Sequence, residues 1–285
     1  MYSMNLHISS ESIGNPILVD LLRHLSRTFT KIDSDFFVIG ATARDIILQA
    51  IGDTAARRKT RDLDIAIAVT DWDRYDKIKQ VLINEGFEKS KQQAQRFYWN
   101  GYEVDVVPYG GVAKADDNIY WPPEEDIAMS VKGFEEVLRE AITVIVDREF
   151  KIQITSLPGL FLLKLNAWID RNLITNKDAE DIWYIIDNYY LATENRNTHQ
   201  EVYDLDGFDF TIGGAFWIAH DIADLLNEEQ IVFYNNVLKK ELSLAENSRL
   251  VTQILDTNRL LKSEDIVKAL SVITDVFTAR TSPLN

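Results

Sequence analysis

Alternating apolar and polar residues mark one strand clearly in the first half of the chain. Between residues 62 and 69 (DLDIAIAV), every second residue from Leu63 to Val69 is a branched apolar side chain. Asp62 and Asp64 stand in the alternate positions, followed by two alanines. Because successive side chains in a strand point to opposite faces, this period of two predicts a strand with both carboxylates on one face.

A shorter apolar run, Asp35–Gly40 (DFFVIG), comes before that strand and ends in glycine. The residues that follow it place Ala43, Ile46, Ile47 and Ala50 on one helical face. This pattern predicts a strand, a tight turn and a helix. Beyond the acidic strand, Asp71 can cap a second helix, which Gly86 closes.

A hairpin is predicted farther along the first half. The runs Arg96–Trp99 and Glu103–Val107 both read as strands, and Asn100-Gly101 lies in the turn between them. Asn-Gly between two strand-like runs is a strong hairpin signal, because both residues accept the positive φ angles of a tight turn.

From Ser156 onward the apolar spacing changes to that of helices. Ser156, with Pro158 close behind it, starts a helix through Leu160–Ile169, and a second one is predicted at Lys177–Tyr190. Four more are predicted at Ala215–Leu226, Glu229–Leu242, Ala245–Leu255 and Ser263–Phe277. The expected fold class is therefore α+β. Residues 1–155 form a domain with a mixed β-sheet and flanking helices, and residues 156–285 form an all-helical C-terminal domain.

Composition narrows the kinds of function that fit this fold. The 285 residues include no cysteine, which excludes disulfides and thiolate metal sites. A formal net charge of -15 argues against a broad basic surface for nucleic acid. No signal peptide and no apolar run of the ~18 residues of a membrane helix is recognisable, so we expect a soluble, cytoplasmic protein without membrane contacts. The histidines, His7, His24, His199 and His220, show no metal-ligand spacing and receive no role.

Three acidic residues are candidates for a metal site. Asp62 and Asp64 lie about 7 Å apart along their strand at a rise of ~3.3 Å per residue. Asp105 lies on the predicted hairpin strand, and it joins them if that strand pairs beside Asp62–Val69. Three converging carboxylates repel one another without a cation, so we expect two Mg²⁺ ions, with Asp105 as a metal ligand and a candidate general base. For an isolated Asp-x-Asp the alternative is a strand edge that faces water.

The predicted turn after the first strand can bind phosphate. Gly40 lets the backbone approach a ligand closely, and the helix start from Ala41 through Thr42 and Arg44 offers free N–H groups and a positive dipole end. A basic cluster, Arg57, Arg58, Lys59 and Arg61, comes just before the acidic strand. We expect it to bind phosphate too, although such a charge run is often only a solvated loop.

Together these motifs resemble the polymerase-beta nucleotidyltransferase superfamily, in which a glycine turn opens a helix, a strand bears Asp-x-Asp, and a later strand bears a third Asp. Gly40, Asp62, Asp64 and Asp105 fill those places. The stretches GATARD and TRDLDIA also resemble the paired motifs of tRNA CCA-adding enzymes, but the helical motifs of those enzymes are not recognisable. Ala41-Thr42 stands where the family often has Ser, so the phosphate-binding hydroxyl is Thr42 or is absent.

The chain resembles the AbiEii/AbiGii-type nucleotidyltransferase toxins more closely. In these toxins a lysine-bearing helix is followed by an Arg and a Lys/Arg-Asp-x-x-Asp run, and Lys164, Arg171 and residues 177–181 (KDAED) fit that pattern. The resemblance implies a catalytic, nucleotide-binding role for Lys164. Asp178 and Asp181 could orient Lys164 or the substrate hydroxyl; the alternative is a solvated first turn in which Lys177 pairs with Asp181.

The resemblance implies a nucleotidyltransferase-type sheet and transfer of NMP from an NTP to a hydroxyl on RNA, such as tRNA, or on protein. It also implies an antitoxin partner. Two alternatives stay open. One is a transferase for a small molecule of the aminoglycoside type, because an acidic surface suits a cationic acceptor. The other is a nucleotide-binding module without catalytic activity.

Overall fold

The computed structural model describes residues 5–52, 62–126, 128–193, 198–257 and 260–282. Contacts within the chain divide it into two compact units, Met1–Ser156 and Leu157–Asn285. This division lies one residue beyond the boundary expected from the sequence. We describe each unit by itself.

The first unit is built on a mixed sheet. In its described part the sheet has eight strands in the order β1-β9-β10-β2-β3-β6-β5-β4. Their bounds are β1 (Asn5–Ile8), β2 (Phe37–Ile39), β3 (Asp62–Val69), β4 (Glu88–Lys89), β5 (Arg96–Trp99), β6 (Tyr102–Gly110), β9 (Ile142–Val146) and β10 (Phe150–Ile154). The strands β7 (Asn118–Tyr120) and β8 (Ala128–Ser130) form a separate pair. β3 has the bounds that its alternation predicts, and its residues Leu63, Ile65 and Ile67 are fully buried.

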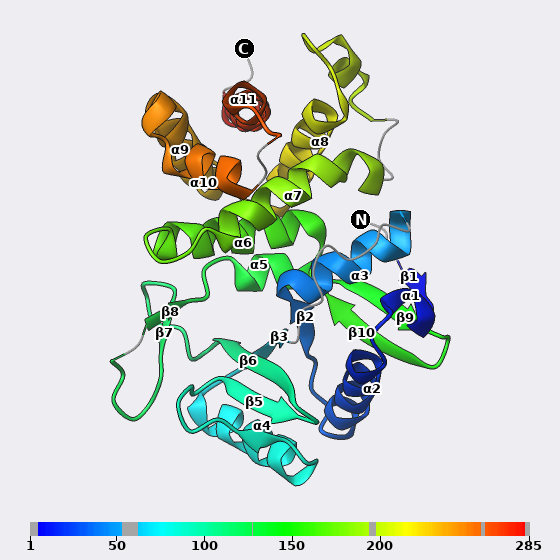
Figure 1. Ribbon diagram of the computed structural model, residues 1–285. Helices are drawn as coiled ribbons and strands as arrows, with labels where there is room; N and C mark the ends of the chain where they lie inside the picture. The colour runs from blue at the N-terminus through cyan, green and yellow to red at the C-terminus, as the bar shows by residue number, and fades with distance from the viewer. Residues whose placement is uncertain (1–4, 53–61, 127, 194–197, 258–259, 283–285) are drawn as a thin grey trace. The chain divides into compact units, whose positions relative to one another are not determined.

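Helices pack against this sheet (Figure 1). They are α1 (Ser10–Ile13), α2 (Pro16–Lys31), α3 (Gly40–Gly52), α4 (Trp72–Asn84) and α5 (Phe134–Arg139). α2 contacts β10, while α3 and α4 contact β3. The predicted cap of α4 is present, because the Asp71 side chain accepts a 2.7 Å hydrogen bond from the Arg74 N–H. Gly40 begins α3 and does not end the preceding strand, so β2 is shorter than the predicted run.

The central strands pair as the sequence predicts. β5 and β6 form an antiparallel hairpin, and positive φ angles of 48° at Asn100 and 76° at Gly101 make its tight turn. β6 then lies parallel to β3, with Leu63 opposite Val104 and Ile65 opposite Val106. All four of these apolar residues are fully buried, which fixes the register because a slip by one residue would expose them.

The second unit is helical throughout its described residues. Its elements are α6 (Leu157–Arg171), α7 (Lys177–Ala192), the 3₁₀ turn η1 (Gln200–Asp204), α8 (Phe210–Leu225), α9 (Glu228–Ser243), the 3₁₀ turn η2 (Ala245–Asn247), α10 (Arg249–Thr257) and α11 (Ser263–Thr281). α8 packs between α7 and α11 (Figure 1). Trp217 near the middle of α8 is buried. This confirms an α+β fold with a mixed sheet followed by helices.

One predicted helix is divided in two. The sequence predicts a single helix at Ala245–Leu255, but the chain forms η2 and then α10. Ser248 separates them, because its hydroxyl donates to Glu241 and accepts a hydrogen bond from the Val251 N–H, as a helix cap does. Among the described helices none is long and apolar enough to span a membrane.

Candidate active site

The register of β3 and β6 brings four carboxylates together on one part of the sheet. Asp64 lies opposite Asp105, and Asp62 lies opposite Glu103. Neighbouring strands are about 4.8 Å apart and opposed residues point to the same face, so Asp64 and Asp105 are direct neighbours. Asp62 is exposed, whereas Asp64 and Asp105 are half-buried. The three predicted acids therefore meet, and Glu103 is a fourth that the sequence reading missed.

Gly40 joins this acidic group to the turn after β2. The strand β2 runs antiparallel to β3, with Ile39 opposite Asp64. Gly40 has a φ of 70°, and a Cβ atom added to it would collide with the Asp64 carboxylate. The backbone therefore approaches Asp64 as closely as only glycine permits. The start of α3, with its outward N–H groups, lies beside the acids.

The other predicted nucleotide-binding residues of this turn are partly engaged within the chain. Thr42 is buried, and its hydroxyl donates a 3.3 Å hydrogen bond to the Asp62 carbonyl. Arg44 is also buried, and it binds the Asp45 carboxylate through Nε at 2.8 Å and Nη2 at 2.7 Å. Ala41 is half-buried. Arg44 thus belongs to a buried ion pair, in which its charge is balanced by its sequence neighbour.

Arg96 binds the third predicted metal ligand. Its Nε and Nη2 donate to the two Asp105 oxygens at 2.7 and 2.8 Å, and its Nη1 reaches Glu103 at 2.8 Å. The hydrogen bonds to Asp105 raise the pKa of the Arg96 guanidinium, so its positive charge is permanent. Repulsion among the acids is therefore partly offset by the chain itself. This repulsion therefore does not by itself require a metal.

The sequence analysis does not identify Arg96 as a site residue, although the hairpin turn indicates its position beside Asp105. The two-residue turn Asn100-Gly101 fixes the hairpin register, which pairs Trp99 with Tyr102 and, three steps on, Arg96 with Asp105. Opposite charges directly across an antiparallel pair stabilise it. The turn position and the antiparallel register are therefore enough to predict that Arg96 lies opposite Asp105.

The donor set of the acidic group fits a hard divalent cation. Asp62, Asp64, Glu103 and Asp105 offer oxygen ligands alone, which Mg²⁺ prefers. The Asp105 carboxylate can hold Arg96 and still contribute, because two carboxylate oxygens offer about four lone-pair sites. The basic cluster at Arg57, Arg58, Lys59 and Arg61 lies outside the described residues.

The second unit contains a separate ionic cluster, made of Lys164, Arg171, Asp178 and Asp181. Lys164 Nζ lies 2.7 Å from Asp181 Oδ2 and 3.5 Å from Asp178 Oδ1. Arg171 binds both Asp178 oxygens, at 2.7 and 2.8 Å. The Asp178 side chain has no exposed surface, and two cations offset the cost of burying its charge.

This geometry decides between the two interpretations of the first turn of α7. A solvated turn with Lys177 paired to Asp181 is wrong, because Asp181 pairs with Lys164 and Asp178 is buried. Both aspartates hold Lys164, as one prediction had it. The two anions that Lys164 meets in these contacts, Asp178 and Asp181, belong to its own chain.

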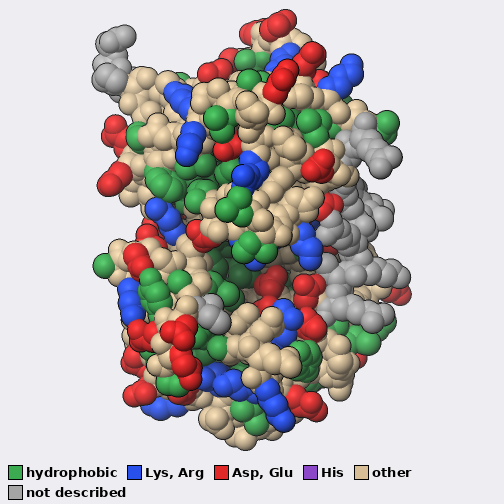
Figure 2. Space-filling view, turned by 60° about the vertical axis from the view of Figure 1, so that its left-hand side comes forward, with side chains coloured by type: hydrophobic (Ala, Val, Ile, Leu, Met, Phe, Trp, Pro, Cys, Tyr) green, Lys and Arg blue, Asp and Glu red, His purple; other side chains and the backbone are tan. Residues whose placement is uncertain are grey.

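Among the described residues on the face shown in Figure 2, Lys and Arg side chains are scattered among Asp and Glu side chains and form no broad basic patch. This agrees with the net charge of -15. Electrostatic attraction for a polyanion on this face would have to come from local groups of residues.

The mixed sheet, the glycine turn beside a strand that bears Asp-x-Asp, and a third Asp on the adjacent strand resemble the arrangement of nucleotidyltransferases. The family described as "Nucleotidyl transferase AbiEii toxin, Type IV TA system" matches residues 21–257. The chain belongs to this family and is a transferase. No curated protein matches it.

Solved nucleotidyltransferase structures are similar at low identity. ANT(2")-Ia in complex with adenylyl-2"-tobramycin is 12% identical with a TM-score of 0.39, covering 62% of this chain and 87% of that one. An antigenic nucleotidyltransferase-like protein from Paracoccidioides brasiliensis is 18% identical with a TM-score of 0.40, covering 63% and 77%. A CCA-adding enzyme with ATP is 14% identical with a TM-score of 0.26, covering 95% and 84%. At these scores the family match, and not the structural likeness, carries the assignment.

Proposed function

We propose that this nucleotidyltransferase uses a divalent metal, Mg²⁺, to transfer a nucleoside monophosphate from an NTP to a hydroxyl group on RNA, such as tRNA, or on protein. The observation that carries the proposal is the pairing of Asp64 with Asp105, next to a glycine turn that opens a helix. Asp62, Asp64 and Asp105 would hold two metal ions. Bound there, the ions would stabilise charge on the triphosphate and lower the pKa of the attacking hydroxyl.

The proposed reaction is a single displacement at the α-phosphorus of the NTP. The acceptor oxygen forms a bond to the α-phosphorus, the bond from that phosphorus to the bridging oxygen of the β-phosphate breaks, and pyrophosphate leaves. The hydroxyl proton passes to a carboxylate, for which Asp105 is our candidate. Arg96 would hold Asp105 in place during this step, because its bidentate contact restricts rotation of the carboxyl group.

The nucleotide would bind at the turn formed by Gly40, Ala41 and Thr42. Backbone N–H groups at the start of α3 can donate to phosphate oxygens, and the helix dipole favours negative charge there. Thr42 supports this turn through its bond to the Asp62 carbonyl. Arg44 and Arg61 are the proposed nucleotide-binding arginines. Arg44 would act while paired with Asp45, and Arg61 would supply a further positive charge for the nucleotide.

In the helical unit we propose that Lys164 acts on the triphosphate, with Asp178 and Asp181 setting its position. The two aspartates hold the ammonium group in the structure. A lysine held this way loses less conformational freedom when a phosphate binds.

The family description includes a toxin of a type IV toxin–antitoxin system. We therefore propose that transfer to a cellular acceptor is harmful and that an antitoxin opposes it. A strongly acidic protein also attracts cations, so a small cationic acceptor of the aminoglycoside type is the second candidate.

The acceptor can be identified with labelled nucleotides. Each NTP, labelled at the α-phosphate, would be incubated with the protein, Mg²⁺ and a cell extract, and in a parallel arm with an aminoglycoside. We expect label in RNA or protein that digestion with RNase or protease removes. Label only in the aminoglycoside arm would instead establish the second candidate, and label in neither arm would contradict transfer itself.

A further inference from the structure

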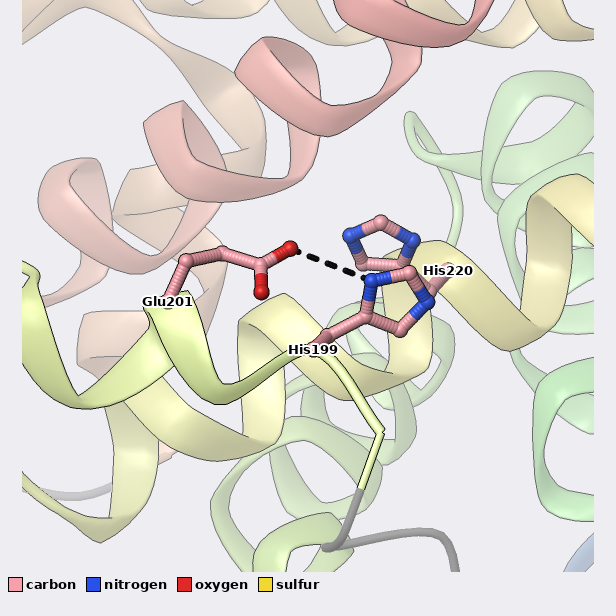
Figure 3. A group of neighbouring side chains, drawn as sticks. All are labelled: His199, Glu201 and His220. Atoms are coloured by element: carbon pink, nitrogen blue, oxygen red, sulfur yellow. Dashed lines mark hydrogen bonds and ion pairs between the residues drawn. The ribbon is translucent and has the colours of Figure 1, made fainter.

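Two histidines and a glutamate from separate elements of the second unit come together in space. His199 comes just before η1, Glu201 is on η1, and His220 is on α8. One ligand atom from each lies within 4.8 Å of the others. Figure 3 shows that one nitrogen of each imidazole lies on the side of the Glu201 carboxylate. The sequence spacing, with twenty residues between the histidines, gives no hint of this group.

Direct contacts within the group explain only part of its arrangement. His199 Nδ1 lies 3.1 Å from Glu201 Oε1, which is an ordinary surface pair. The two imidazole rings stack with their centroids 3.8 Å apart. Stacking alone does not direct a nitrogen of both rings toward one carboxylate.

One further observation suits a ligand in this group. His220 Nδ1 is buried and has no hydrogen-bond partner among the described residues. A buried polar atom without a partner costs free energy unless an unseen water or ion satisfies it.

The surrounding charges allow a cation. Arg280 on α11 lies near His220, but its Nη2 is 2.7 Å from Asp224 Oδ1, so that carboxylate offsets its charge. Glu201 then gives the group a negative charge. A neutral imidazole has the lone pair that a metal needs.

We propose that His199, Glu201 and His220 form a Zn²⁺ site that is separate from the acidic residues on the sheet. Two imidazoles and one carboxylate suit zinc, which binds nitrogen and oxygen at about 2.0–2.2 Å, and they do not suit Mg²⁺, which prefers oxygen alone. The two imidazole rings, which stack with an interplanar angle of 26°, would have to turn out of this stack for both lone pairs to converge on one ion with Glu201. Water fills the fourth position.

A metal bound there would connect η1 to α8. η1 is mostly exposed: Gln200, Glu201, Tyr203 and Asp204 are exposed and Val202 is buried, while Tyr203 contacts Phe208 and Tyr190. A metal that binds only the folded arrangement stabilises it. Zinc should therefore raise the melting temperature, and the effect needs no nucleotide.

The test measures Zn²⁺ binding by isothermal titration calorimetry on protein without a histidine tag. Excess Mg²⁺ is present to occupy the oxygen-donor residues on the sheet. We expect wild type to bind one Zn²⁺, and Glu201→Gln, His199→Gln and His220→Gln each to weaken the affinity by more than tenfold. The matched control is His7→Gln, because His7 is an exposed histidine of the first unit.

Circular dichroism checks the fold of each variant. If His220→Gln does not fold, the other two decide, because Glu201 is exposed and His199 is half-buried, so both tolerate a change better. Zinc binding in both that equals wild type would overturn the proposal, as would an equal loss in His7→Gln. Co²⁺ in place of Zn²⁺ gives a second readout, since its visible absorption reports four-coordinate binding in wild type and its loss in the variants.

Discussion

Among single residues, Gly40 occupies a position that favours glycine for two separate reasons. Its φ of 70° is strained for any other residue, and a side chain there would also displace Asp64. At Gly101 only the backbone angle favours glycine, because its φ is 76° and nothing lies within 4 Å of an added Cβ. The two glycines are therefore a matched pair for separating strain from damage to the acidic residues.

We expect Gly40→Ala and Gly101→Ala to lower the free energy of unfolding by a similar amount, about 1–2 kcal/mol, from left-handed strain. Only Gly40→Ala should also lower nucleotidyl transfer, by up to about a hundredfold, because it moves Asp64. Denaturant unfolding and a transfer assay measure the two effects. Equal activity in the two variants would show that the approach of Gly40 to Asp64 is not needed.

At the scale of elements, the β5–β6 hairpin carries both an acid and the cation that offsets it. Arg96→Gln would leave Asp62, Asp64, Glu103 and Asp105 without that cation. The stability of the metal-free protein should fall by about 1.5–3 kcal/mol, the usual value for hydrogen bonds to a charged group. Mg²⁺ should then raise the melting temperature more in the variant than in wild type.

Arg96→Lys is the control for charge, because it keeps the cation and loses the bidentate geometry. It should show a smaller increase in the Mg²⁺ effect than Arg96→Gln. A response to Mg²⁺ that is the same in all three proteins would mean that the metal does not bind near Asp105.

In the helices α6 and α7, a variant of Lys164 can test whether this lysine takes part in catalysis or only neutralises the charges of Asp178 and Asp181. Lys164→Met leaves Asp181 without its partner, so it should lower stability and also reduce transfer by roughly ten- to more than a hundredfold if the lysine binds phosphate. Adding Asp181→Asn should restore part of the stability, because the unpaired charge is gone.

The double variant should stay as inactive as the single one. Thermal unfolding and steady-state kinetics give the two readouts. Recovery of transfer along with stability would show that Lys164 has a structural role only.

Local signals explain which parts of these elements were predictable. β3 was predicted to the residue because its alternation reflects one buried face, and the turn at Asn100-Gly101 was readable because few residues accept its φ angles. By contrast, β1 pairs with β9 from far along the chain, and no local pattern records such a partner. The bond from Arg171 to Asp178 was equally hidden, because it depends on how α6 packs against α7.

For the molecule as a whole, we expect Mg²⁺ and the NTP to bind together. Mg²⁺ with NTP should raise the melting temperature, since a ligand at a hundred times its dissociation constant stabilises the native state by about 2.7 kcal/mol. Mg²⁺ alone should do much less. Differential scanning fluorimetry can compare the two, and an NTP shift of equal size in EDTA would mean that the triphosphate is not held through a metal.

The central claim is that Asp62, Asp64 and Asp105 support transfer of the α-phosphate with release of pyrophosphate. The most direct measurement compares NTP labelled at the α-phosphate with NTP labelled at the γ-phosphate, in wild type and in Asp64→Asn, with Mg²⁺ and a cell extract. We expect α-label in the acceptor, γ-label in pyrophosphate, and loss of both in the folded variant. Label from the γ-phosphate in the acceptor, or undiminished transfer in Asp64→Asn, would contradict it.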